Sequence, residues 1–119
     1  MDADVHILVV DDDAPMRMMT QRVLERAGYA VSTAGSGGEG LGRALQEHPD
    51  LLLLDVVLPD VSGFEICQTL KARPETRDVH VIMLSGMRID ALSRAKGLEI
   101  GADDYISRPI ADRELLARV

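Results

Sequence analysis

Short apolar runs alternate with longer amphipathic stretches along the whole chain. The apolar runs are bounded by acidic or turn-forming residues, and in the run Leu51 to Leu54 four leucines follow one another. Continuously apolar runs of this length are typical of strands that are buried on both faces of a sheet. We expect five strands, over residues 5–10, 29–33, 51–55, 79–84 and 105–107.

The stretches between these runs carry apolar residues at helical spacing. In residues 14–27, for example, the spacing predicts that Met16, Met19, Val23 and Leu24 share the inward face of one helix. We expect five helices, over residues 14–27, 36–47, 62–72, 89–100 and 111–119.

Strict alternation of strand and helix predicts the fold class. Buried strands separated by helices form a parallel sheet that is covered on both faces, and the crossovers are right-handed. The 119 residues are enough for one such domain. We therefore expect an α/β fold with a five-stranded parallel sheet, doubly wound as (βα)5. Ligands of such sheets bind beyond the carboxyl ends of the strands.

The composition of the chain argues against several classes of function. The net charge is −7 and aromatic residues make up 3% of the chain. Such a domain repels phosphate backbones and has few rings for base stacking, so we expect no direct nucleic-acid binding. The apolar runs are too short to span a bilayer, the acidic start lacks the basic opening of a signal peptide, and the single cysteine, Cys67, cannot form an internal disulfide. We expect a cytoplasmic protein without membrane contact.

Polar side chains gather where the expected strands end. Asp11 and Asp12 follow the first strand, Asp55 ends the third, Ser85 follows the fourth and Arg108 follows the fifth. Carboxylates that are crowded together resist ionisation, and Mg²⁺, which prefers oxygen ligands, relieves that crowding. One Mg²⁺ together with the arginine balances the three carboxylates. The pattern therefore predicts a magnesium site at this edge of the sheet.

Four motifs, in this order and at this spacing, resemble those of response-regulator receiver domains, and the resemblance covers essentially the whole chain. They are LVVDDD at residues 8–13, LLDVVLPDVSG at 53–63, VIMLSG at 81–86 and GADDYISRP at 101–109. The resemblance implies a flavodoxin-like strand order of 2-1-3-4-5. It also implies a phosphoacceptor in two-component signal transduction that is served by a sensor histidine kinase or a histidine phosphotransfer protein. On phosphorylation, the surface around the fourth and fifth strand-helix units would then change conformation.

The resemblance implies roles for the acidic residues. Asp55 stands at the position of the phosphoacceptor, which takes the phosphoryl group from a phosphohistidine. Asp12 and Asp55 match the direct Mg²⁺ ligands, with the backbone carbonyl of Val57 as a third, and Asp11 matches a ligand that acts through water.

The remaining motif residues match the family's switch. Ser85 corresponds to the hydroxyl that contacts the phosphoryl group, and Tyr105 to an aromatic residue that changes rotamer. Arg108 replaces the family's lysine; we expect it to do the same work by pointing inward, the alternative being a head that reaches Asp11 or solvent. Pro109 matches a proline that follows a cis peptide bond.

Alternatives to the phosphoacceptor stay open. Arg108 is the one argument for a receiver-like interaction module that does not need phosphate. A hydrolase would need a general acid near Asp55, and Val57 supplies none. We expect no enzyme beyond self-catalysed phosphotransfer and slow autodephosphorylation, because Val57 and Met87 are both apolar and cannot activate water.

Two further features of the sequence are local. Residues 35–40 match the dinucleotide pattern G-x-G-x-x-G, but a dinucleotide fold needs two such halves, so we interpret them as a loop and a weak helix start. Asp13 is explained by capping of the first helix.

The last helix is shorter than the family usually has. We therefore expect residues 1–119 to be a single receiver domain of a longer protein. An output domain in the same chain and a homodimer are both left open.

Overall fold

The computed structural model describes residues 5–85, 99, 101–107 and 111–119. Within this part of the chain, five strands form one sheet in the order β2-β1-β3-β4-β5, and every neighbouring pair is parallel. The predicted sheet and its strand order are therefore confirmed. The strands are β1 (His6–Val10), β2 (Ala30–Ala34), β3 (Leu51–Asp55), β4 (His80–Ser85) and β5 (Asp104–Ser107).

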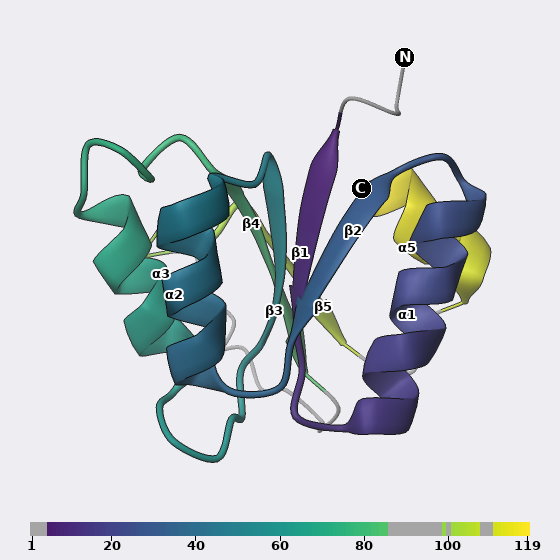
Figure 1. The fold of residues 1–119 in the computed structure, drawn as a ribbon, viewed down its shortest axis with the longest axis horizontal. Helices are drawn as coiled ribbons and strands as arrows, with labels where there is room; N and C mark the ends of the chain where they lie inside the picture. Colours follow the sequence, from purple (N-terminus) through teal and green to yellow (C-terminus); the bar gives the residue numbers. More distant parts are fainter. Residues whose placement is uncertain (1–4, 86–98, 100, 108–110) are drawn as a thin grey trace.

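Helices cover both faces of the sheet, as the doubly wound topology requires (Figure 1). α2 and α3 lie on one face, and α1 and α5 lie on the other. Each described helix and strand begins and ends within one residue of its predicted range. Of the helix expected over residues 89–100, only Glu99 is among the described residues, and it is helical. The described helices are α1 (Ala14–Arg26), α2 (Gly37–Glu47), α3 (Gly63–Lys71) and α5 (Asp112–Arg118).

The core consists of two apolar layers, one on each face of the sheet. Alternate residues of β1 enter different layers: Leu8 and Val10 pack beneath α2 and α3, whereas Ile7 and Val9 pack beneath α1 and α5. Every residue of β3 is buried, which is why its leucines form an unbroken run. Because apolar layers cover both faces of these strands, charged side chains reach solvent at the strand ends.

The predicted inward face of α1 is wrong in part. Leu24 is fully buried, but Met16 and Met19 are exposed and Thr20 takes an inward position instead. The Thr20 hydroxyl donates a hydrogen bond to the Met16 carbonyl oxygen at 3.0 Å. Because this hydroxyl is satisfied within the helix, burying it costs little, and helical spacing then pairs Thr20 with Leu24. None of the described helices is long and apolar enough to cross a membrane.

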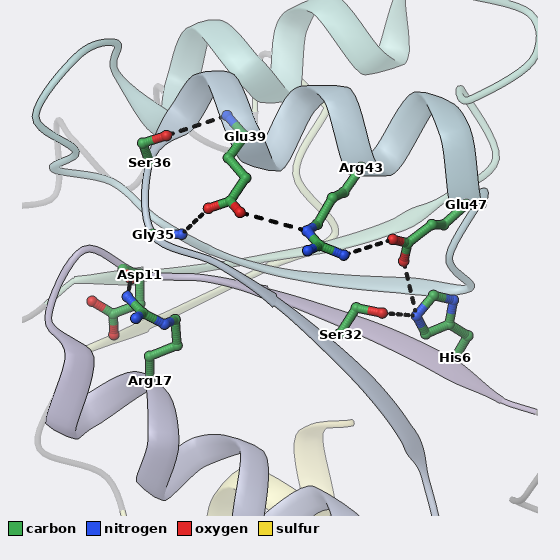
Figure 2. Close-up of polar contacts among 9 residues, drawn as sticks. All are labelled: His6, Asp11, Arg17, Ser32, Gly35, Ser36, Glu39, Arg43 and Glu47. Atoms are coloured by element: carbon green, nitrogen blue, oxygen red, sulfur yellow. Dashed lines mark hydrogen bonds and ion pairs between the residues drawn. The ribbon is translucent and has the colours of Figure 1, made fainter.

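A row of polar side chains runs along α2 on the side that faces β2 (Figure 2). At the amino end of this row, Glu39 accepts a hydrogen bond from the Gly35 backbone N–H at 2.8 Å. Arg43 lies one turn further on and bridges Glu39 and Glu47, with N···O distances of 3.7 and 3.0 Å. Charges of alternating sign four residues apart stabilise the helix.

The row ends on the sheet, where Glu47 meets His6 of β1 at 3.3 Å. His6 also lies 2.7 Å from the Ser32 hydroxyl of β2. The Ser32 hydroxyl, followed by Arg43 and His6, holds the pKa of the Glu47 carboxyl below its ordinary value of 4.5, although partial burial opposes this. Glu47 therefore ties the carboxyl end of α2 to β1 and to the neighbouring edge strand β2.

This contact makes stability depend on pH. A carboxyl whose pKa is lowered by folding contributes stability that is complete above 4.5 and is lost as the pH falls through the folded pKa. We expect Glu47→Gln to lower the free energy of unfolding at pH 7, and the difference from wild type to shrink below about pH 4. Urea unfolding across pH 3–7 measures both. Glu75→Gln, at an exposed position, is the control and should change little at any pH; a Glu47→Gln deficit that is constant with pH would contradict the prediction.

Candidate functional site

Three carboxylates meet at the carboxyl ends of β1 and β3. These strands are neighbours with Val10 opposite Leu54, so the residues that follow, Asp11 and Asp55, emerge side by side. Asp12 extends the group, and ligand oxygens from the three residues all lie within 4.8 Å of one another. Asp11 and Asp55 are buried and Asp12 is exposed, so the group opens to solvent on one side.

These residues fit a magnesium ion. Mg²⁺ takes hard oxygen ligands at about 2.1 Å and keeps several waters, so opposite ligands lie about 4 Å apart. The three carboxylates supply such oxygens at that spacing, and the exposed side at Asp12 leaves room for the waters. A divalent cation also offsets the mutual repulsion of three negative charges.

Backbone contacts fix the orientation of Asp11. Its N–H donates to the Ala34 carbonyl oxygen at 3.1 Å, which continues the β1–β2 ladder by one residue. Its side-chain Oδ1 accepts from the Asp13 N–H at 3.0 Å. Its own carbonyl oxygen accepts from Nη1 of Arg17 at 2.8 Å (Figure 2). Asp13 caps α1 as predicted, accepting from the Met16 N–H at 3.1 Å.

Arg17 was missed by the sequence analysis. It lies on α1 and brings a fixed positive charge next to the acidic group, but through the Asp11 backbone rather than a carboxylate. No motif marks this position, because the contact depends on how α1 returns along the sheet.

The loop after β3 fixes the orientation of Asp55. The Val57 N–H donates to Oδ1 of Asp55 at 3.2 Å, and the Val56 N–H donates to the Leu84 carbonyl oxygen of β4 at 2.9 Å. The loop returns at once to α3, where the Gly63 N–H donates to the Val56 carbonyl oxygen at 2.9 Å. A Cβ atom on Gly63 would lie 2.3 Å from the Asp55 carbonyl oxygen, so only glycine fits there.

The other predicted residues fall on several strands. Ser85 is buried at the end of β4, one residue beyond the position that pairs with Asp55. Tyr105 of β5 is buried as well, with its ring centroid 6.5 Å from that of Phe64. Val57 is 60% exposed, so its side chain faces solvent beside the acidic group. The predictions for Arg108, Pro109 and Met87 lie outside the described residues.

Comparison with known proteins shows which family the chain belongs to. A model of the response regulator receiver domain matches residues 7–119. The chain belongs to the response-regulator receiver family. Its function is that of the family, a phosphoacceptor domain in two-component signal transduction, as the sequence motifs predicted.

Relatives and solved structures agree with this assignment. The receiver domain is 42% identical to the alkaline phosphatase synthesis transcriptional regulatory protein PhoP of Bacillus subtilis, over 95% of this chain and 46% of that protein. It is also 42% identical to the phosphate regulon transcriptional regulatory protein PhoB of Pseudomonas aeruginosa, over 95% of this chain and 49% of that one. A putative response regulator from Chloroflexus aurantiacus superposes with a TM-score of 0.89 at 36% identity, covering 96% of this chain and 93% of the other. The chain thus spans about half the length of these curated relatives.

The contact between Gly63 and the end of β3 gives a direct test of the site's local packing. We expect Gly63→Ala to lower the free energy of unfolding by about 2 kcal/mol, because the new methyl group meets a backbone oxygen that cannot move alone. Gly42→Ala is the matched control: a Cβ there meets nothing within 4 Å, and alanine should stabilise α2 by up to about 1 kcal/mol. Denaturant titration of both variants measures the effect, and equal stability of the two would show that the packing is wrong.

Proposed function

We propose that Asp55 is the residue that is phosphorylated, and that Asp12 and Asp55 bind Mg²⁺ directly, with the Val57 carbonyl as a third ligand and Asp11 acting through water. The observation that supports this is the convergence of three carboxylates at the ends of two adjacent buried strands. Asp55 ends the central strand β3, and its neighbours on both sides come from other strands. A phosphoryl donor can therefore approach Asp55 only from the side of the sheet where the carboxyl ends of the strands lie.

The chemistry of the step follows from these side chains. A carboxylate oxygen of Asp55 attacks the phosphorus of a phosphohistidine, the new P–O bond forms as the P–N bond breaks, and the histidine ring leaves with the electron pair. The Val57 N–H holds Oδ1 of Asp55 and thereby sets the angle of attack. Bound Mg²⁺ supplies the positive charge that phosphoryl transfer needs. The Ser85 hydroxyl, at the end of the adjacent strand, then contacts the transferred group.

The remaining assignments extend the same proposal. Tyr105 changes rotamer when Ser85 moves toward the phosphoryl group, Arg108 replaces the family's lysine as the fixed cation, and Pro109 follows a cis peptide bond. The intact set of Asp11, Asp12 and Asp55 favours this role over an interaction module that does not need phosphate.

The phosphoryl donor that we propose is a sensor histidine kinase or a histidine phosphotransfer protein. Met16, Met18 and Met19 in the first two turns of α1, together with Val57, are the exposed large apolar side chains among the described residues. The methionines lie in the helix that follows Asp12 and the valine in the loop that follows Asp55, and exposed apolar side chains of this kind favour protein docking. The longer curated relatives are named as transcriptional regulators, so we also propose an output domain in the same protein, and action in the cytoplasm.

We further propose that the phosphorylated state is long-lived. Hydrolysis needs a water molecule held behind the phosphorus, and the position two residues after Asp55 is an exposed valine. An apolar side chain cannot orient or deprotonate that water. Self-catalysed phosphotransfer followed by slow autodephosphorylation is then the whole of the domain's chemistry.

The assignment of Asp55 is tested by intact mass after treatment with acetyl phosphate and Mg²⁺. Wild-type protein should gain one phosphoryl group and Asp55→Asn none, because the amide is not a nucleophile for phosphorus. Asp50→Asn, the same substitution just before β3, is the control and should be phosphorylated normally. Phosphorylation of Asp55→Asn at the wild-type rate would refute the assignment.

The lifetime is tested by following the loss of that phosphoryl group over time. Val57→Asn should speed it by roughly tenfold, well short of the 10²–10⁴ that a full general base gives. Met19→Asn changes an equally exposed apolar residue on α1 and should leave the decay unchanged. Identical decay of wild type and Val57→Asn would contradict the proposed role of the valine.

A further inference from the structure

The loop between β3 and α3 is anchored at its tip to a different helix. Asp60, near the middle of residues 56–62, reaches α2, and its two carboxylate oxygens accept separate backbone hydrogen bonds. Oδ1 accepts from the Gly37 N–H and Oδ2 from the Gly38 N–H, both at 2.8 Å. In Figure 1 this loop passes beneath the amino end of α2. The contact joins residues that are 22 and 23 positions apart.

The geometry makes this a strong anchor. The first N–H groups of a helix have no partner within the helix, and the helix dipole places partial positive charge on them. A carboxylate that takes two of them forms charge-assisted hydrogen bonds, which are stronger than neutral ones. The N–H groups of Gly38 and Gly37 accordingly hold the pKa of the Asp60 carboxyl below its ordinary value of 3.8, so it is ionised at neutral pH.

Glycine permits the approach of loop and helix. A Cβ atom on Gly37 would lie 2.2 Å from Cγ1 of Val61, and one on Gly38 would lie 3.2 Å from Oδ2 of Asp60. The glycine-rich residues 35–40, whose sequence matches a dinucleotide-binding pattern, thus receive a carboxylate of their own chain where that pattern would receive a phosphate. This gives the motif a role that the sequence analysis did not assign.

The anchor lies on the segment that carries Val57. At its start, that segment is tied to the sheet by Val56 and to the Asp55 carboxylate by Val57 itself. Asp60, three residues beyond Val57, ties the tip to α2. The peptide groups between these two attachments, including the Val57 carbonyl, are therefore held at both ends.

We propose that Asp60 is a positioning residue for magnesium: by holding the loop tip on α2, it fixes the Val57 carbonyl as a metal ligand. This inference rests on the proposed function, in which that carbonyl binds Mg²⁺. It makes the amino end of α2 part of the support of the metal site. Loss of the anchor frees the loop to sample other positions, and the ion then has to order the loop when it binds.

The test is Mg²⁺ titration of Asp60→Ala, followed by ¹⁵N-resolved NMR. We expect the dissociation constant to rise about tenfold, the lower end of the loss seen when the outer support of a metal site is removed. The Gly37 and Gly38 amide resonances should move in the metal-free variant, showing that the contact is broken. Asp60→Asn keeps one accepting oxygen for two donors and should give an intermediate constant.

Ser62→Ala is the matched control, because it removes a different helix cap from the same loop. The Ser62 hydroxyl accepts from the Phe64 N–H at 3.1 Å at the start of α3. We expect this variant to lose thermal stability while its Mg²⁺ affinity stays at the wild-type value. A structural role alone would not produce this separation of stability from metal affinity.

Three results would overturn the inference, and they differ in what else they overturn. If folded Asp60→Ala, or Asp60→Asn where the alanine variant does not fold, binds Mg²⁺ as wild type does, the positioning role is wrong and the metal site stands. If Ser62→Ala weakens Mg²⁺ binding as much as Asp60→Ala does, the weaker binding comes from general loosening of the loop and not from loss of a specific anchor. If wild type itself takes up no Mg²⁺, or takes it up no better than Asp12→Ala, the proposed function fails together with the inference.

Discussion

A strand that is buried on both faces can carry charge only at its ends, and the organisation of this receiver domain depends on that constraint. β1 is apolar from Ile7 to Val10 and β3 from Leu51 to Leu54, because each strand supplies side chains to both layers of the core. Their parallel pairing sets Val10 opposite Leu54 and leaves Asp11 and Asp55 together at one edge. The acidic group is thus a product of strand register, and a one-residue slip would send these side chains to opposite faces.

Close packing of α2, α3 and the loop before α3 against the strand ends makes that edge of the sheet a site. Gly63 presses against the end of β3, and Gly40 brings α2 against Val10, where a Cβ atom would lie 2.7 Å from Cγ2 of that valine. Asp60 then joins the loop after Asp55 to α2. These contacts fix the chain next to Asp11 and Asp55, because Val10 precedes Asp11 and Gly63 meets the Asp55 carbonyl oxygen. Such preorganisation matters for phosphoryl transfer, which is accelerated mainly by positioning and charge.

Sequence predicts those parts of the structure that depend on local pattern. The unbroken leucines of β3 indicate a central strand, and the acidic residues after β1 and β3 indicate where a metal would bind. The inward face of α1 was predicted wrongly, because methionine was expected inside and a threonine that bonds its own helix was not. Arg17 and Asp60 were not found at all. Their partners lie on other elements, so no spacing along the chain reveals them.

The assignment of Asp55 as phosphoacceptor is tested most directly by a crystal structure of the protein with Mg²⁺ and beryllofluoride, a mimic of the phosphoryl group. Beryllium should be bonded to a carboxylate oxygen of Asp55, with Mg²⁺ held by Asp12, Asp55 and the Val57 carbonyl. A mimic bonded to another residue, or Mg²⁺ held without Asp55, would contradict the assignment.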